Sequence, residues 1–353
     1  MMMKKEMLLK KQVEYNSFDD ADIKNIIFGV DANYIKYAAV TMLSIIKHNQ
    51  DENIAFHIFC DEIKEEDLQK IKHMTEENPQ ISIIIYYLSN EVIAEFPQNA
   101  DWNLSIYYRA IAPYILHGKI KRALYLDADI LCLGNINDLF TMDLPSVIGI
   151  VEDGLKGNAK TELMIDLGIS SHKTYFNSGV MLIDIDRYFE EDILSKFIDC
   201  IKNNITKLKM YDQDAFNIIL GKEAYYLDDM YNIQKFMPTK NTQIVFFHFV
   251  GSLKPWGLNV NRFKSDTWKE FYYSSAWGNI ELNNILNLKP HYYRIMSKYL
   301  WRNKQYHDSV KKYFVYLMKK LRVIYKPYPL SRTFLREREK QQFLPEPLLL
   351  SFY

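Results

Sequence analysis

Apolar runs alternate with amphipathic segments through the first 130 residues. Continuous apolar stretches predict buried strands at residues 25–30, 54–60, 81–88 and 123–126. Apolar residues at helical spacing predict helices between them, at residues 37–48, 64–77 and about 105–117. This regular β-α-β-α-β order predicts an α/β fold with a parallel sheet of nucleotide-binding type, flanked by helices.

The pattern is more mixed after residue 140 and changes again near residue 283. Further strands are predicted at 146–151, 180–183 and 244–248, and further helices at about 190–203 and 212–221. From residue 283 to 353, aromatic residues interleave with Lys and Arg at helical spacing. We expect a polar, partly disordered N-terminal lead-in over residues 1–24, a folded α/β domain over 25–282 and a basic helical extension over 283–353.

The formal net charge of the 353 residues is zero, but it is unevenly distributed. Between Lys289 and Lys340, fifteen Lys and Arg residues stand against three acidic ones, a net charge of +12. Because Glu346 follows, residues 1–288 carry a net charge of −11. A basic arm on an acidic body indicates an anionic partner, either a nucleic acid or a membrane surface. The arm has little glycine and no nucleic-acid-binding motif, so no nucleic acid partner is expected.

Cysteine usage and the length of the apolar runs bear on location. The three cysteines, Cys60, Cys132 and Cys200, lack metal-ligand spacing and lie in apolar or helical patterns, so buried thiols are expected. No apolar run is long enough to cross a bilayer, and the Met-Leu-Leu island near the N-terminus is too short for a signal peptide. We therefore expect a cytoplasmic protein.

The segment Lys121–Leu133, KRALYLDADILCL, places Asp127-Ala128-Asp129 directly after a buried strand. Side chains two apart on a strand project to the same side, and ligands of open α/β sheets bind at the carboxyl ends of the strands. Two converging carboxylates require a shared proton or a cation. The pair therefore predicts a divalent metal that holds substrate phosphates.

Two features of the chain narrow this interpretation. Asp-x-Asp occurs four times, and we expect Asp184/Asp186 to cap a helix and Asp20/Asp22 to be solvated. A Gly-rich phosphate-binding loop is missing from the sequence, because Gly29 has no second glycine nearby. A bound nucleotide would need another way to hold its phosphates, and a metal on the carboxylate pair would provide it.

Five short motifs occur in a fixed order along the chain: FGVDANY (28–34), LYLDAD (124–129), YFNSGV (175–180), YDQD (211–214) and HFVGSLKPW (248–256). Together they make residues 25–258 resemble family 8 of the glycosyltransferases, retaining enzymes that include bacterial lipopolysaccharide glucosyl- and galactosyltransferases and glycogenin. The resemblance implies a GT-A-type mixed sheet flanked by helices. It also implies a UDP-sugar donor and a Mn²⁺ or Mg²⁺ cofactor. The basic, aromatic C-terminal extension is similar to that of the lipopolysaccharide-core members.

Matching motifs imply roles for individual residues. Asp127, Asp129 and His248 would be the metal ligands, and the imidazole favours manganese. Lys254 would pair with the pyrophosphate, where Gly251 lets the backbone approach. The full donor-binding set implied by the resemblance is Gly29, Val30, Asp31, Asn33, Arg109, Asp127, Ala128, Asp129, Asn177, Ser178, Gly251 and Lys254.

Within that set, Asp31 and Asn33 would hold the uracil and ribose, although alone they would be interpreted as an Asx turn or a helix cap. Arg109 would reach the donor sugar and phosphate, although a lone arginine on a helix is usually at the surface. Asn177 and Ser178 would line the sugar pocket. Relatives also have alanine at the position of Ser178, which would tune the choice of hexose.

Gln213 and Asp212 are the predicted catalytic residues. Gln213 matches the family position nearest the far face of the anomeric carbon, but an amide is a poor nucleophile. We therefore favour front-side attack, with both residues stabilising the positive charge that develops on the sugar. Asp212 also fits a helix N-cap, and Asp153 is a weaker candidate for a sugar or acceptor contact.

The sequence therefore predicts a metal-dependent retaining transferase that moves glucose or galactose from a UDP-sugar to a lipopolysaccharide core or other oligosaccharide acceptor. Its basic arm would hold it peripherally on the cytoplasmic face of the inner membrane. One alternative is a UDP-hexose transferase acting on a protein or another glycan, as glycogenin does. Others are a non-enzymatic binding scaffold and an Asp127-dependent phosphotransferase, which would need a hydroxyl residue where the chain has Ile130-Leu131-Cys132.

Overall fold

A computed structural model describes residues 5–17, 22–99, 103–169, 174–235, 242–286 and 288–324. The chain divides into two compact units, Met1–Leu286 and Asn287–Tyr353, which we describe separately. The domain boundaries predicted after residues 24 and 282 remain predictions.

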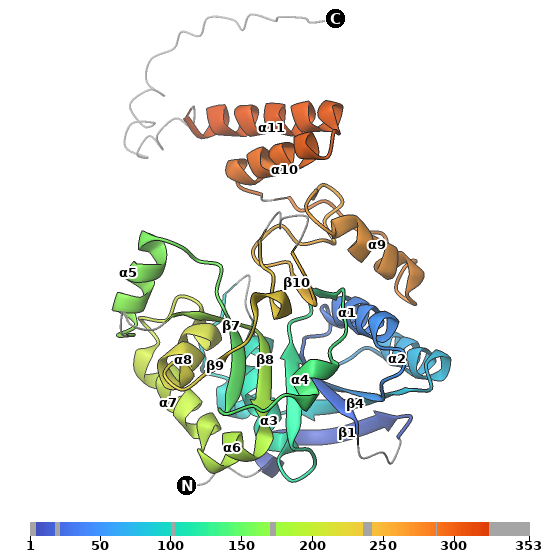
Figure 1. Cartoon of the computed structure of the whole chain (residues 1–353), viewed down its shortest axis with the longest axis vertical. Helices are drawn as coiled ribbons and strands as arrows, with labels where there is room; N and C mark the ends of the chain where they lie inside the picture. The colour runs from blue at the N-terminus through green and yellow to red at the C-terminus, as the bar shows by residue number, and fades with distance from the viewer. Residues whose placement is uncertain are drawn as a thin grey trace, which may run out of the picture. The chain divides into compact units, whose positions relative to one another are not determined.

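The first unit is built on an eight-stranded sheet of order β1-β4-β3-β2-β5-β8-β7-β9 (Figure 1). Its strands are β1 (Leu9–Tyr15), β2 (Lys24–Gly29), β3 (Ile54–Cys60), β4 (Ile81–Leu88), β5 (Arg122–Leu126), β7 (Ile148–Glu152), β8 (Phe176–Asp184) and β9 (Tyr225–Tyr226). Strands β2 to β5 run parallel, whereas β8 is antiparallel to both β5 and β7. The mixed, helix-flanked sheet is the predicted fold.

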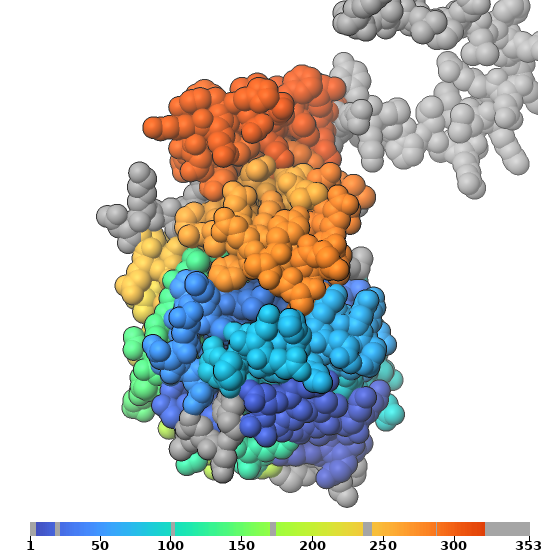
Figure 2. Space-filling model, turned by 90° about the vertical axis from the view of Figure 1, so that its right-hand side faces the viewer, coloured from blue at the N-terminus to red at the C-terminus, as the bar shows by residue number. Residues whose placement is uncertain are grey.

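Helices cover both faces of this sheet, and a hydrophobic core lies on each side. One face carries α1 (Ile35–His48), α2 (Glu65–Glu77) and α9 (Ser265–Ser274). The other carries α3 (Tyr108–Leu116), α6 (Ile185–Glu190), α7 (Ile193–Asn204) and α8 (Tyr211–Leu220). In Figure 2 the orange segment that contains α9 lies directly against the blue helix α1. The remaining helical elements are η1 (Lys5–Met7), η2 (Glu91–Ile93), η3 (Leu104–Tyr107), α4 (Asn137–Thr141), α5 (Asn158–Asp166) and η4 (Asp229–Tyr231).

The edge strand β1 differs from the sequence prediction. Residues 1–24 were expected to be a partly disordered lead-in, yet Leu9–Tyr15 pair antiparallel with β4, with Val13 opposite Ile85. The strand has no buried residue, and Lys10, Lys11 and Glu14 give it a charged character. An exposed edge strand needs no apolar run, and charge protects it from pairing with another chain. That is why the hydrophobic pattern did not mark it.

A second, two-stranded sheet positions the chemistry. β6 (Ile130–Cys132) pairs antiparallel with β10 (Phe246–His248), and His248 lies opposite Ile130. The segment 127–129 connects β5 to β6, and Ala128 and Asp129 form a turn directly after the strand, which ends at residue 126 as predicted. This pairing brings the end of β10 beside the Asp-x-Asp motif, although the two are about 120 residues apart in the sequence.

The second unit contains α10 (Pro290–Arg302) and α11 (Tyr306–Ile324), which pack against each other. The Ser309 hydroxyl, between the two helices, lies 3.0 Å from the Ser297 hydroxyl and donates to its carbonyl at 2.8 Å. Among the residues that the structure describes, no helix is long and apolar enough to span a membrane. The rest of the predicted extension, residues 325–353, lies outside the described part of the chain.

Candidate functional site

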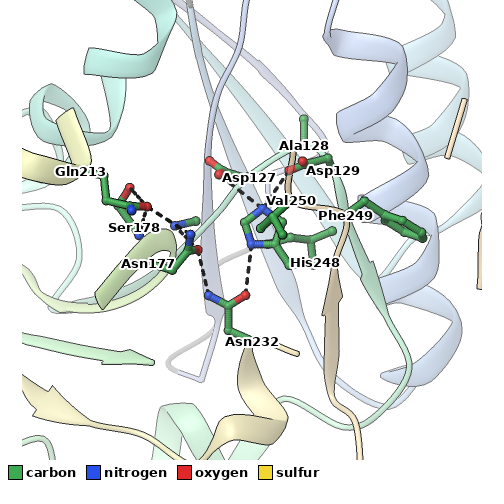
Figure 3. A network of polar contacts seen from close by, with 12 residues as sticks. Asp127, Ala128, Asp129, Asn177, Ser178, Gln213, Asn232, His248, Phe249 and Val250 are labelled. Atoms are coloured by element: carbon green, nitrogen blue, oxygen red, sulfur yellow. Dashed lines mark hydrogen bonds and ion pairs between the residues drawn. The ribbon is translucent and has the colours of Figure 1, made fainter. Parts of the chain in front are cut away.

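Three side chains of the kind that ligate metals converge where β5, β6 and β10 meet (Figure 3). His248 Nε2 lies 3.1 Å from Asp129 Oδ1 and 3.7 Å from Asp127 Oδ2. One ligand atom from each residue lies within 4.8 Å of the other two, and the described ranges contain no other such group. The structure thus brings together the three residues that the sequence singled out as metal ligands.

Each carboxylate of this cluster also contacts a basic side chain. Lys254 Nζ bonds to Asp129 Oδ2, and Arg109 Nη2 lies 2.9 Å from Asp127 Oδ1. Burial raises the pKa of Asp129, but the charge of the adjacent Lys254 is the largest effect that opposes burial, and the pKa is held well below its ordinary value. Asp129 is therefore ionised at neutral pH.

The donor set fits a divalent cation. Carboxylate oxygens suit Mg²⁺ and Mn²⁺, and an added imidazole suits Mn²⁺. His248 Nδ1 lies 3.0 Å from Asn232 Oδ1, so its Nε2 is turned toward the two carboxylates. The space between these groups depends on Gly179 of β8. A Cβ at that position would lie 2.6 Å from Asp127 Oδ2 and would also contact the His248 ring.

Arg109 connects the group of Asp127, Asp129 and His248, called the metal cluster below, to the predicted sugar pocket. Its Nε lies 3.1 Å from Asp212 Oδ2, and its Nη1 donates to Ser178 Oγ at 2.9 Å. Burial would lower the pKa of Arg109, but Asp127 and Asp212 outweigh burial and keep the guanidinium charged. Arg109 is only 7% exposed, so it belongs to this site and not to the helix surface.

Asp212 faces Arg109 and does not cap α8. The N-cap residue is Met210, and Asp214 accepts hydrogen bonds from the backbone N–H groups of Lys209 and Met210 at 2.6 and 2.7 Å. Burial raises the pKa of the Asp212 carboxyl to about 6, although the charge of Arg109 opposes the rise. The helix-cap alternative for Asp212 is therefore wrong.

Gln213 and Asn177 form a buried amide pair beside this ion pair. Asn177 Nδ2 donates to Gln213 Oε1 at 3.0 Å and to Asp153 Oδ2 at 3.2 Å. Gln213 Oε1 also accepts a hydrogen bond from the Ser178 backbone N–H at 3.1 Å. Asn177 and Ser178 lie on β8, which begins at Phe176, earlier than the predicted strand at 180–183. A cavity of about 370 Å³ opens beside Asp153.

The remaining predicted donor residues follow β2. Asp31 Oδ1 accepts hydrogen bonds from the backbone N–H groups of Asn33 and Tyr34 at 2.7 and 3.0 Å, which is the Asx turn anticipated from the sequence. Val30 is buried, whereas the Asn33 side chain is exposed. A Cβ at Gly29 would come within 3.0 Å of the Tyr108 Cβ, so this strand end packs closely on α3.

The loop that carries Lys254 is anchored from two sides. Trp256 stacks on Tyr37 of α1 with ring centroids 3.9 Å apart and a 6° interplanar angle. Arg262 donates to the Leu253 carbonyl at 3.1 Å and to the Val250 carbonyl at 3.4 Å. Gly251, between these anchors, has φ of +77°, a conformation that strongly favours glycine.

Some residues of the site carried no usable sequence signal. Asn232 and Arg262 lie outside the five motifs, and nothing in a single sequence distinguishes a buried amide or arginine from an exposed one. Of the other Asp-x-Asp pairs, Asp184 accepts a hydrogen bond from the Arg187 N–H at 3.0 Å and caps α6 as predicted. Asp20 lies outside the described residues.

A mixed nucleotide-binding sheet that carries an Asp-x-Asp turn and a distant histidine defines the class of GT-A-type glycosyltransferases. Within that class, this chain belongs to glycosyl transferase family 8, whose sequence model matches residues 25–259. The resemblance drawn from the five motifs is confirmed, and the chain is a glycosyltransferase.

Individual relatives cover most of the chain. This chain is 29% identical over 310 residues to a lipopolysaccharide 1,2-glucosyltransferase of Escherichia coli, and the match covers 83% of this chain and 90% of that protein. It is 28% identical over 333 residues to a lipopolysaccharide 1,3-galactosyltransferase of Salmonella typhimurium, covering 90% and 97% respectively. The galactosyltransferase LgtC, solved with donor and acceptor sugar analogs, has the same fold with a TM-score of 0.63 and 22% identity, covering 71% of this chain and 96% of LgtC.

Proposed function

We propose that this enzyme transfers glucose or galactose from a UDP-sugar to a lipopolysaccharide core oligosaccharide, with retention of anomeric configuration. One observation carries the proposal: two relatives that span most of the chain, at 29% and 28% identity, are a lipopolysaccharide glucosyltransferase and a lipopolysaccharide galactosyltransferase. The cavity beside Asp153 adjoins the sugar pocket and offers space for the acceptor.

The donor phosphates would bind at the Asp127, Asp129 and His248 cluster. A Mn²⁺ or Mg²⁺ ion held there would neutralise the pyrophosphate and the charge on departing UDP. Lys254 is the cation best placed to turn toward a phosphate, because its side chain is 24% exposed and its only carboxylate contact among the described residues is Asp129. Arg109 is held by two carboxylates, and its proposed role is to orient the sugar end of the site.

The arrangement of Gln213 favours front-side attack over a covalent intermediate. An amide oxygen has two lone pairs, and Gln213 Oε1 already accepts hydrogen bonds from Asn177 Nδ2 and the Ser178 N–H. In front-side attack the acceptor hydroxyl bonds to the anomeric carbon as the bond to UDP breaks, and its proton passes to a departing phosphate oxygen. Gln213 and the ionised Asp212 would stabilise the positive charge on the sugar.

We also propose that the C-terminal extension attaches the enzyme to the cytoplasmic face of the inner membrane. On α11, Val310, Phe314, Leu317 and Leu321 recur at helical spacing and are between 39% and 62% exposed. Lysines lie along the same helix, and each basic residue near anionic lipid contributes about 1 kcal/mol. An exposed apolar stripe among positive charges is typical of interfacial helices.

The first test measures UDP release from a panel of UDP-sugars, with Mn²⁺ or with EDTA, and with or without truncated lipopolysaccharide. We expect release from one UDP-hexose that requires the metal, increases with the lipid acceptor, and falls at least about 100-fold in Asp129→Asn. Release stimulated by a protein acceptor but not by lipid would favour the glycogenin-like alternative. No release from any UDP-hexose would refute the proposal.

A further inference from the structure

Asn232 lies between the metal cluster and the sugar pocket, outside every motif of the sequence analysis (Figure 3). It is 3% exposed, its Oδ1 lies 3.0 Å from His248 Nδ1, and its Nδ2 donates to Asn177 Oδ1 at 3.0 Å. We propose that Asn232 is a positioning residue that selects the metal-binding tautomer of His248 and couples it to Asn177 of the sugar pocket and, through Asn177, to the predicted catalytic amide of Gln213. This inference rests on the proposed function of the site.

Two groups that can play only one role fix the direction of this hydrogen-bond chain. The Gly179 backbone N–H can only donate, and it donates to Asn177 Oδ1 at 3.1 Å. The Asp153 carboxylate accepts from Asn177 Nδ2 at 3.2 Å. Asn177 must therefore present its oxygen to Asn232, which can meet that oxygen only with its NH₂ group. The Asn232 oxygen is then left to face His248.

The consequence for His248 is a defined tautomer. Because Asn232 Oδ1 can only accept, His248 Nδ1 carries the proton and donates it at 3.0 Å. The other ring nitrogen, Nε2, then points its lone pair at Asp127 and Asp129, which is the form that ligates a metal. Without Asn232, a proton on Nε2 would pair with Asp129 Oδ1 at 3.1 Å and compete with the metal for that position.

In the other direction, the same chain of hydrogen bonds leads from Asn232 to the sugar pocket. Asn177 is held by Asn232 on one side and donates to Gln213 Oε1 at 3.0 Å on the other. A shift of Asn232 therefore reaches the predicted catalytic amide through one intervening residue. The geometry gives the metal cluster and the sugar pocket a shared support.

Two substitutions separate these two roles. Asn232→Asp keeps an oxygen that accepts the His248 Nδ1 proton but removes the donor to Asn177 Oδ1. Asn232→Ala removes both contacts. The matched control is Asn49→Ala, another buried bridging amide, 2% exposed, which donates to the Ile45 carbonyl at 2.8 Å and lies outside the site.

Three readouts are taken on the full-length protein: Mn²⁺ affinity by calorimetry, the ring-nitrogen chemical shifts of ¹⁵N-labelled histidine, and kcat and KM for the UDP-hexose. The chain has eight histidines, and His248→Gln identifies the signal of His248. With diamagnetic Mg²⁺ bound in place of Mn²⁺ for the NMR measurement, the wild-type signal should show protonated Nδ1 and unprotonated Nε2. Asn232→Ala should lose this pattern and about 10- to 100-fold in Mn²⁺ affinity.

Asn232→Asp should keep Mn²⁺ affinity at or above the wild-type value while kcat/KM for the UDP-hexose falls at least tenfold. Asn49→Ala should lower thermal stability and leave both Mn²⁺ affinity and kcat/KM for the UDP-hexose at their wild-type values. Wild-type Mn²⁺ affinity in Asn232→Ala, or equal loss of metal affinity in both Asn232 variants, would overturn the inference. The metal and NMR readouts need no transfer, so a protein that binds Mn²⁺ with the expected tautomer but transfers no hexose would refute the proposed function alone.

Discussion

At the scale of single residues, the site depends as much on a missing side chain as on those present. Gly179 lies on β8 directly against Asp127 and His248, and a Cβ there would sit 2.6 Å from Asp127 Oδ2. We expect Gly179→Ala to push the ligands apart and to weaken Mn²⁺ binding at least about tenfold, measured by calorimetry. Overpacking should also cost about 1–3 kcal/mol of stability.

The control for this substitution is Gly149→Ala on the neighbouring strand β7. An added Cβ there would meet Leu144, Leu227 and Leu182 at 3.2 to 3.4 Å, away from the metal cluster. It should lower the melting temperature without affecting Mn²⁺ affinity. If Gly179→Ala binds Mn²⁺ like the wild type, the ion does not occupy the space beside this glycine.

The same scale shows what a single sequence can reveal about a site. Asp127 and His248 were identifiable because each lies in a motif with a recognisable spacing. Asn232 and Arg262 were not, because their importance comes from burial and from contacts with residues nine or more positions away in the sequence. Asp212 and Arg109 were both singled out from their motifs, but the ion pair between them became visible only when α3 and α8 were placed together.

At the scale of elements, β3 carries a titratable group that ties stability to pH. His57 is buried, with Nε2 3.0 Å from Asn25 Oδ1 and Nδ1 3.1 Å from the Tyr86 hydroxyl, and burial lowers its pKa from 6.5 to about 3. The unfolded chain therefore binds this proton more readily. The stability that neutral His57 contributes is complete above pH 6.5 and is lost as the pH falls toward 3.

We expect the titration of His57 to lower the free energy of unfolding by about 2 kcal/mol between pH 7 and pH 5. The free energy of unfolding can be measured at both pH values by urea unfolding, followed by tryptophan fluorescence. Between pH 7 and pH 5 the wild type should lose about 2 kcal/mol more of it than His57→Gln, whose side chain cannot titrate. Equal losses in both proteins would mean that His57 binds its proton in the folded state.

The elements were predictable in proportion to their burial. The strands at 54–60 and 81–88 were placed at their observed bounds, because all of their residues are buried and apolar character runs through them. β1 has no buried residue and was missed. β8 begins earlier than predicted because Asn177, Ser178 and Gly179 look like a turn in the sequence. In the fold Asn177 pairs with Val151 of β7, and Ser178 and Gly179 lie at a register shift of that pairing, beside the metal cluster.

At the scale of the whole molecule, the uneven charge predicts where the enzyme works. We expect the full-length protein to sediment with vesicles containing anionic phospholipid, and not with neutral vesicles, because the stretch Lys289–Lys340 carries a net +12. Binding should weaken as salt rises, since the charges are screened within about 8–10 Å at physiological ionic strength.

The apolar stripe of α11 should contribute separately from the charge. Phe314 is 62% exposed, and burying one large apolar side chain in a membrane contributes about 1.5–3 kcal/mol, so Phe314→Ser should reduce vesicle affinity at least about tenfold. The matched control is Ile165→Ser on α5, which is 70% exposed and should leave vesicle binding unchanged. Metal-dependent UDP release in solution should be the same in both variants, because neither residue touches the site. Phe314→Ser could instead sediment with vesicles like the wild type, with high salt releasing both proteins. The C-terminal extension would then bind the membrane surface by charge alone, and its aromatic residues would not contribute to binding.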